Sequence, residues 1–357
     1  MFEALTAWFE RRRALRELRA IEGKSSQGFA KYFSEQIVAA RLAFRAGDRE
    51  RALRIWRDMN ECYPKLCMTS DEALNLVVDL GQYDEVEALI RVGRRRYPWH
   101  RAMFATISAR AAHGRGDADE TLRRCAVLHR KFPGVAAGYT IAAACLADLG
   151  RKDEAEAMIE QAASRFPRNY EIIVAHARYA ERRKDWPKAL ERWRVLTDRF
   201  DDFLGPVGVA QSLREMGRYD EAREIATEAS ERFPDSPWAD VELARIAAAV
   251  GNLEGAAQHW ETTRERFPDF AVAYTAGAEA VRRVGREAEA DKILGLAVTR
   301  LRYDLGVHLE FARSADRRGD KTAMERWRLV CDRFPDCAEA RGRAAEALMT
   351  PEDHTAP

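Results

Sequence analysis

The sequence predicts an all-α fold, a right-handed α-solenoid of about nine helix–turn–helix repeats. Two observations lead to this prediction. An aromatic residue followed by proline recurs every 33 to 35 residues, and a glycine recurs in phase with it. The apolar residues on both sides of the glycine follow helical spacing. A unit of this size cannot bury its apolar face alone, so neighbouring copies are expected to stack into a superhelix.

The aromatic–proline pairs are expected to end the second helix of each repeat, because proline cannot continue a helix. They are Tyr63-Pro64, Tyr97-Pro98, Phe132-Pro133, Phe166-Pro167, Phe233-Pro234, Phe267-Pro268 and Phe334-Pro335, and Phe200-Asp201 and Leu301-Arg302 keep the register without proline. Three pairs lie within the tetrapeptide RFPD, which starts at Arg232, Arg266 and Arg333. An Asp or Ser after the proline is expected to cap the next helix.

The in-phase glycines are expected to form the turn between the two helices, since glycine adopts the left-handed backbone that ends a helix. The positions are Gly47, Gly81, Gly116, Gly150, Lys184, Gly217, Gly251, Gly285 and Gly319. In the copy around Gly150, apolar residues recur at helical spacing on both sides: Tyr139, Ala142, Ala143, Leu146, Ala155, Met158, Ile159 and Ala162.

These markers resemble the tetratricopeptide repeat family over roughly residues 32–335. The family's second-helix alanine and later aromatic appear as Ala-x-x-x-Trp at Trp56, Trp193 and Trp260, and its small first-helix residue as Ala143, Ala210, Ala244 and Ala278. The departures are Val86 and Thr121 for alanine, Lys184 for glycine, and one missing residue near Met324. The resemblance implies a protein-binding scaffold.

The chain is expected to divide into five parts. They are an N-terminal amphipathic helix (1–22), a linker (23–31), nine repeats (32–335), a capping helix (336–349) and a flexible tail (350–357). The first helix places Phe2, Trp8 and Phe9 on one broad face, with arginines nearby and a net charge of +1. It can dock on the first repeat, on a partner or, weakly, on a membrane, and the sequence leaves these three open.

Composition limits the function classes. The 59 Lys and Arg nearly balance the 58 Asp and Glu, so no global charge attracts nucleic acid or anionic lipid. We expect a cytoplasmic protein, since no signal peptide or membrane span is evident, with peripheral membrane association through residues 1–22 left open. Six cysteines in 357 residues fit a reducing compartment.

No catalytic motif is found, so we expect neither an enzyme nor a cofactor. The sequence has no Gly-rich phosphate loop, no G-x-S-x-G and no H-E-x-x-H. Cys62 with Cys67 and Cys331 with Cys337 straddle repeat turns, but each pair lacks the other two ligands of a zinc site, so no metal is expected. The two RGD tripeptides, at Arg115 and Arg318, fall on the repeat's own glycine turn.

The resemblance implies that the first helices line a concave groove and that the ninth residue of each repeat points into it. These residues are Arg41, Asn75, Arg110, Ala144, Arg178, Gln211, Arg245, Glu279 and Arg313, so every odd-numbered repeat has arginine. Arg182, Arg282 and Arg317 are further groove candidates. The family's carboxylate clamp is not reproduced, because Asn75 matches one clamp position but Asp71 stands where lysine is expected.

Two interpretations of the arginines remain open. They can pair with groove acids such as Asp71, Glu181, Glu215, Glu242 and Glu310. Alternatively, they form a ladder of guanidinium groups that binds carboxylates or sulfates through bidentate hydrogen bonds.

The leading functional hypothesis is a non-enzymatic scaffold that holds an extended or helical, acidic segment of another protein. One alternative is an accessory protein of surface-polysaccharide or glycosyl-transfer assembly, with Trp238 and Phe44 as groove contacts. Another is helical-repeat RNA binding. The near-zero net charge and the lack of regular stacking aromatics argue against nucleic acid.

Overall fold

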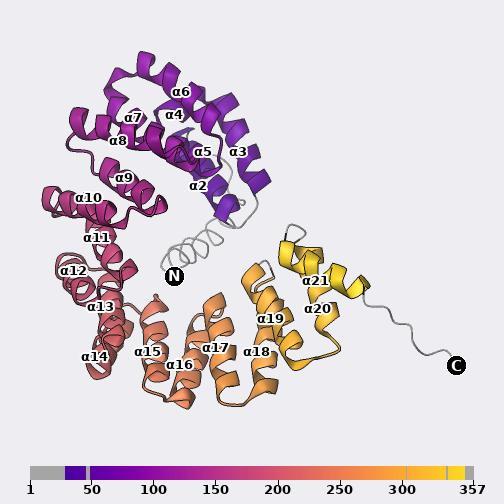
Figure 1. The fold of residues 1–357 in the computed structure, drawn as a ribbon. Coiled ribbons are helices and arrows are strands. Elements are labelled where there is room, and N and C mark those ends of the chain that lie inside the picture. Colours follow the sequence, from indigo (N-terminus) through magenta and orange to yellow (C-terminus); the bar gives the residue numbers. More distant parts are fainter. Residues whose placement is uncertain (1–28, 46–48, 303, 335–336, 350–357) are drawn as a thin grey trace. The chain divides into compact units, whose positions relative to one another are not determined.

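The computed structural model describes residues 29–45, 49–302, 304–334 and 337–349, and within them every regular element is helical. Consecutive helices pack in pairs, so the predicted all-α fold of stacked helical hairpins is confirmed (Figure 1). The predicted helix at 1–22, most of the linker, the turn at Gly47 and the tail at 350–357 lie outside the described residues.

The chain forms two compact units that divide between Arg199 and Phe200, where the repeat register lacks its proline. The helices of the first unit are α2 (Phe29–Arg45), α3 (Arg49–Cys62), α4 (Pro64–Thr69), α5 (Asp71–Asp79), α6 (Tyr83–Arg96), the 3₁₀ turn η1 (Pro98–His100), α7 (Arg101–Gly114), α8 (Ala118–Lys131), α9 (Ala137–Asp148), α10 (Lys152–Arg165), α11 (Tyr170–Arg182) and α12 (Trp186–Arg199).

The second unit continues the same alternation of first and second helices. Its helices are α13 (Leu204–Glu215), α14 (Tyr219–Arg232), α15 (Trp238–Ala249), α16 (Leu253–Arg266), α17 (Ala271–Arg283), α18 (Glu287–Arg300), α19 (Leu305–Arg318), α20 (Ala323–Arg333) and α21 (Ala338–Met349). The last helix packs on α20 and follows the ninth hairpin.

The turn predicted at the in-phase glycines is confirmed at each described position. Seven glycines, from Gly81 to Gly319, have φ between 61° and 86°. Lys184, which replaces glycine in the fifth repeat, also takes the left-handed conformation with φ of 59°. A side chain in this region is strained, so Lys184 is held there by the flanking helices.

The first helix of the second repeat differs from the single helix that the pattern predicts. It is divided into α4 and α5 at Ser70, whose backbone is extended with ψ of 119°. The Ser70 hydroxyl accepts a hydrogen bond from the Ala73 backbone N–H at 3.2 Å. A serine that caps its own helix start competes with a continuous helix, which explains the break.

The prediction that the aspartate of RFPD caps the next helix is wrong where it can be checked. The N-cap residues of α15 and α17 are Pro237 and Phe270, and neither makes a side-chain cap bond. A backbone hydrogen bond from Ser236 N to Phe233 O, 3.0 Å, closes a turn in which Asp235 is the third residue. The aspartate therefore lies in the turn, before the helix begins.

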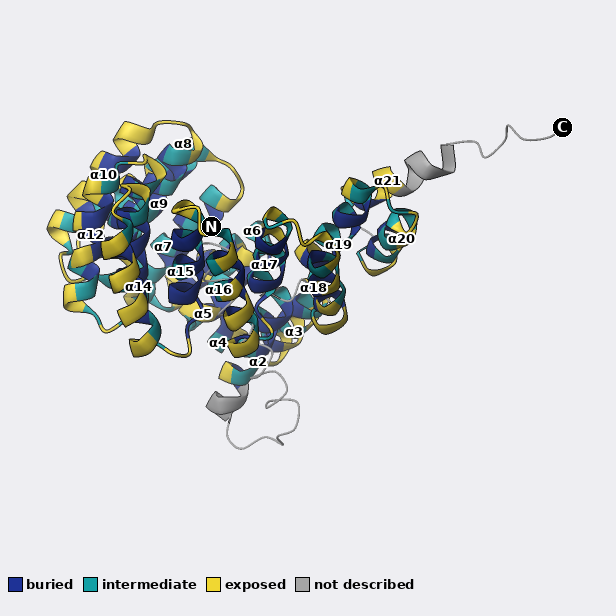
Figure 2. Ribbon diagram, turned by 90° about the horizontal axis from the view of Figure 1, so that it is seen from below, coloured by how far each residue is buried: buried dark blue, intermediate teal, exposed yellow. Residues whose placement is uncertain are grey.

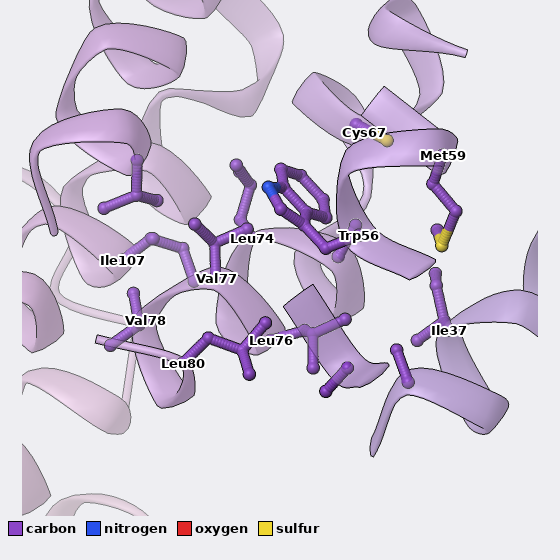
Figure 3. Close-up of a cluster of buried hydrophobic side chains, with 14 of the residues drawn as sticks. Ile37, Trp56, Met59, Cys67, Leu74, Leu76, Val77, Val78, Leu80 and Ile107 are labelled. Atoms are coloured by element: carbon purple, nitrogen blue, oxygen red, sulfur yellow. The ribbon is translucent and has the colours of Figure 1, made fainter. Parts of the chain in front are cut away.

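Most second helices bury one face and expose the other, whereas the first helices α13 and α15 are buried along almost their whole length (Figure 2). At the start of the first unit, Trp56 of α3, Leu74 and Leu76 of α5 and Ile107 of α7 belong to one buried cluster (Figure 3). The cluster draws on three successive repeats, as expected of units that cannot form separate cores. The indole N–H of Trp56 donates to Glu85 at 2.8 Å, which satisfies its one polar atom.

Candidate binding surface on the first helices

Several first helices pack on the first helix of the next repeat. In the first unit α5 contacts α7 and α7 contacts α9; in the second, α13 contacts α15 and α17 contacts α19. Among the described residues, no two full-length second helices pack to a similar extent. First helices are therefore closer to one another than second helices are. The face of the first helices that points away from the second helices forms the inner surface of each unit. We call the groove candidates on these helices the inner row.

In the first unit, inner-row arginines form hydrogen bonds with residues of a neighbouring repeat. Arg41 of α2 donates forward to the carbonyl oxygen of Glu72 at 3.2 Å. Arg110 of α7 donates to the side-chain oxygen of Asn75 and to Asp79 Oδ1, the latter at 3.1 Å. The structure thus brings two predicted residues, Asn75 and Arg110, into direct contact from adjacent repeats.

Arg178 and Arg182 lie one turn apart on α11. The guanidinium of Arg182 stands over the ring of Tyr179, 5.4 Å from its centroid, a cation–π contact. Glu181, one of the groove acids named as pairing partners, accepts a hydrogen bond from the indole N–H of Trp193 at 2.6 Å. Glu181 therefore helps to bury the tryptophan of its own repeat.

In the second unit, Arg245 shares a buried carboxylate with an arginine that the sequence did not single out. Glu242, only 1% exposed, accepts from Arg245 Nη1 at 2.7 Å and from Arg214 Nε at 2.9 Å. Arg214 also pairs with Glu215 at 2.7 Å. Burial acts to lower the pKa of Arg214, but the two carboxylates outweigh it and raise that pKa overall. Gln211, another predicted residue, is buried on α13.

Near the end of the second unit, Arg313 is held by carboxylates on two helices. Its Nε and Nη2 donate to the two oxygens of Glu339 on α21 at 3.0 and 2.6 Å, and its Nη1 donates to Glu310 at 3.3 Å. Arg317 also binds Glu310, at 3.3 Å. The hydrogen bond between Arg313 and Glu339 raises the pKa of the arginine and lowers that of the acid.

Arg282 is the most deeply placed of the additional candidates. Its side chain is bonded to Glu279, the ninth-position acid of the same helix, and lies 3.6 Å from Glu287. Glu242 and Glu310, which were named as pairing partners, bind inner-row arginines. A carboxylate arriving from outside would have to exchange with these internal partners.

The aromatic residues proposed as sugar contacts are placed differently from the expectation. Trp238 is 2% exposed and packs edge-on against Phe270, with ring centroids 5.2 Å apart. Phe44 is partly buried against the first core cluster. Trp238 is therefore a core residue and offers no open surface to a ligand.

The arginine before the aromatic residue, as in RFPD, links neighbouring repeats, a role not predicted from the sequence. Arg266 Nη2 donates to the carbonyl oxygen of Pro234 at 3.3 Å, and Arg165 Nε to that of Pro133 at 2.8 Å. Arg199 bonds Pro167 O in the same way, and Arg333 bonds Arg302 O at 3.2 Å. Each arginine links the end of its repeat to the preceding one. Its recurrence at a fixed position before the aromatic was the available signal.

A second set of arginines, on the second helices, links neighbouring repeats from within. Arg192 donates to His176 O of its own repeat at 2.8 Å. It also donates to Glu156 of the preceding repeat at 2.8 Å. Arg124 repeats this arrangement with Ser108 O and Glu87, and Arg326 with Phe311 O and Asp291. These buried or half-buried contacts are structural and leave the inner row as the candidate binding surface.

In the described part of the chain, no group of three or more His, Cys, Asp and Glu side chains is arranged to hold a metal ion. None of the described helices combines the length and apolar composition that a membrane span requires.

Comparison with known proteins agrees with the fold. Residues 213–280 match a family model described as tetratricopeptide repeat. No curated protein sequence matches the chain. The structure of yeast Tom70 aligns with a TM-score of 0.59 at 11% identity, covering 97% of this chain and 88% of that one. At such identity the likeness concerns the fold alone.

Two further structures are similar at lower scores. A tetratricopeptide repeat protein from Parabacteroides merdae aligns over 69% of this chain and 98% of its own, with 14% identity and a TM-score of 0.49. The APC/C hetero-tetramer Cut9–Hcn1 aligns over 87% of this chain with 15% identity and a TM-score of 0.44. This chain covers 63% of the length of that one.

Proposed function

The chain is a tetratricopeptide repeat protein, a kind of fold that generally mediates protein–protein interaction, and we propose that it acts as a non-enzymatic scaffold. Its ligand is an extended or helical segment of another protein that carries acidic side chains, held along the inner row. The observation that supports this proposal most directly is that first helices pack on one another within each unit, α5 on α7 in the first and α13 on α15 in the second. Helices of this set carry the inner-row arginines.

The inner row supplies cations that remain accessible although they are paired. The side chains of Arg110 and Arg313 are 37% and 42% exposed. Ion pairs at such exposure contribute little to stability, about 0 to 1 kcal/mol, so exchanging one carboxylate for another costs little. A partner's acidic side chain can therefore replace Asp79 or Glu310 without leaving a buried charge unpaired.

Glu339 shows the geometry that we propose for the ligand. Both of its oxygens meet the Nε and Nη2 edge of Arg313, the bidentate arrangement that planar guanidinium favours. Arg245 is more deeply set, and it shares Glu242 with Arg214, which also pairs with Glu215. Because Arg245 has only half of this shared carboxylate, a partner's carboxylate can add a second hydrogen-bond acceptor to it.

The proposal is tested by replacing Arg110, Arg178 and Arg245 together with alanine and comparing the proteins captured from the native cell. A matched control replaces Arg130, Arg194 and Arg328, exposed residues of the second helices α8, α12 and α20, so that the same charge is removed elsewhere. We expect specific partners to be lost from the inner-row variant and retained by the control. Undiminished capture by the inner-row variant, with unchanged helicity, would refute the proposal.

A further inference from the structure

Positive charge is concentrated in one segment of the first unit. Residues 88–116 contain seven arginines and no Asp or Glu. The whole chain has a formal net charge of +1, so +7 in this segment leaves −6 for the rest. Two of the seven, Arg110 and Arg115, pair with Asp79 and Asp84 from the preceding part of the chain.

The other five arginines lie close together at one end of a hairpin. Arg91, Arg94, Arg95 and Arg96 are on the last turns of α6, and Arg101 begins α7; all five are exposed. No ion pair joins any of them to a residue that the structure describes. The buried face of α6 carries Val86, Ile90 and Gly93, so the arginines occupy its solvent side.

Apolar side chains lie among these charges. Trp99, in the 3₁₀ turn between α6 and α7, is 72% exposed, and Val92 is 48% exposed. Trp99 is the most exposed large hydrophobic residue of the described chain. The ring of Tyr97 meets the Trp99 indole edge-on, with ring centroids 5.8 Å apart, and the His100 ring lies 6.1 Å from the indole. These two rings contact part of the indole, and the rest of it is exposed to solvent.

We propose that this arginine–tryptophan cluster, formed by Arg91, Arg94, Arg95, Arg96, Trp99 and Arg101, binds the surface of an anionic lipid bilayer. Tryptophan and arginine together suit the headgroup region, where an indole finds both apolar and polar surroundings and a guanidinium meets phosphate. The cluster shares no residue with the inner row.

A bilayer fits the cluster better than a nucleic acid does. Three consecutive helical residues, Arg94 to Arg96, fan out over about 200° around α6. Fluid lipid headgroups can rearrange around such a spread, whereas a nucleic-acid backbone follows a line of cations. Single-stranded nucleic acid also uses several aromatic stacking surfaces, and Trp99 is the cluster's one aromatic side chain exposed beyond a third of its surface.

The expected strength follows from the number of charges. Each Lys or Arg near an anionic membrane surface strengthens binding about fivefold, so removing three predicts a loss of about a hundredfold. The attraction between exposed charges is screened within about 8 Å at physiological salt. Binding should therefore weaken markedly as salt increases, and the contribution of Trp99 should remain.

The test uses the full chain and vesicles of phosphatidylcholine with about one third phosphatidylglycerol, compared with phosphatidylcholine alone. The cluster variant carries Arg94→Gln, Arg95→Gln and Arg96→Gln. The matched control carries glutamine at Arg130, Arg194 and Arg328, three exposed second-helix arginines, and so has the same net charge. Trp99→Ala is a third variant, and circular dichroism checks that all are folded.

We expect the wild type and the control to sediment with the anionic vesicles only, and the cluster variant to bind about a hundredfold more weakly. Trp99→Ala should bind more weakly and lose part of the blue shift in tryptophan fluorescence. Equal binding by the cluster and control variants would overturn the proposal, since it would place the contact elsewhere, for example at residues 1–22. Tighter binding of polyuridylate or polyglutamate than of vesicles, lost in the same variant, would overturn it too.

Discussion

The guanidinium of Arg192 on α12 binds the carboxylate of Glu156 on α10 at 2.8 Å, and both side chains are largely buried. The same arginine also donates to His176 O in its own repeat, so it joins two neighbouring repeats. Because a solenoid is stabilised mainly by contacts between neighbours, such a link should contribute to the stability of the first unit as a whole.

Replacing Arg192 with methionine should lower the free energy of unfolding by about 3 kcal/mol, since it removes the main partner of a buried carboxylate. Urea denaturation measures this change. Arg194→Met, at an exposed position on the same helix, should change stability by less than about 0.5 kcal/mol. The double variant Arg192→Met with Glu156→Met should be more stable than Arg192→Met alone. A double variant that is less stable would show that the lone carboxylate is not the cause.

Lys184→Gly should stabilise the protein by about 1 kcal/mol, because glycine takes the left-handed backbone without steric strain. The matched reverse change is Gly217→Ala. Gly217 has φ of 76° and open space around it, so the added methyl group would meet no neighbour and only the backbone strain would count. We expect the two variants to shift the urea midpoint in opposite directions. A destabilised Lys184→Gly would indicate that the lysine side chain makes a contact that outweighs its strain.

The free energy of unfolding should depend on pH in the acidic range because of Asp291. The hydrogen bond from Arg326, with a further one from Arg318, lowers the pKa of this carboxyl from 3.8 to about 2. A depressed folded-state pKa gives stability that is present above pH 4 and is lost as pH falls toward 2. Asp291→Asn should remove on the order of 1 kcal/mol at neutral pH and little at pH 2. A constant difference between wild type and variant from pH 6 to pH 2 would contradict this assignment.

His176 should act in a different pH range. Burial lowers its pKa from 6.5 to about 4, with the nearby charge of Arg192 acting in the same direction. The unfolded chain then takes up a proton that the folded protein does not, so stability falls as pH decreases from 6.5 toward 4. His176→Gln should flatten the stability profile in this range and leave the range below pH 4 unchanged. Measuring the free energy of unfolding at a series of pH values from 7 to 2 distinguishes the effect of His176 from that of Asp291.

The sequence predicted the hairpins and their register because single residues determine these features locally. Gly150 and its equivalents must leave the right-handed backbone, and Pro167 and its equivalents must end a helix, whatever surrounds them. That Trp238 is buried could not be predicted from single residues. Its indole is covered by Phe270 from the next repeat, and that contact depends on how two repeats pack.

The candidate site was predictable to a similar extent. The pairing of Arg245 with Glu242 follows from their spacing of three residues on one helix. The approach of Arg214 to the same carboxylate, from 28 residues away, needs the three-dimensional packing of α13 on α15. The cluster from Arg91 to Arg101 was not predicted, because the near-zero net charge of the whole chain hides a local excess of arginine.

The most direct test of the scaffold function is the dissociation constant of a captured partner, measured by titration calorimetry with the wild type, the inner-row variant and the second-helix control. The inner-row variant replaces Arg110, Arg178 and Arg245 with alanine, and the control does the same at Arg130, Arg194 and Arg328. We expect the inner-row changes to weaken binding at least tenfold, about 1.4 kcal/mol, with the control unchanged. Equal affinities for all three proteins would contradict the proposal that partners bind along the first helices.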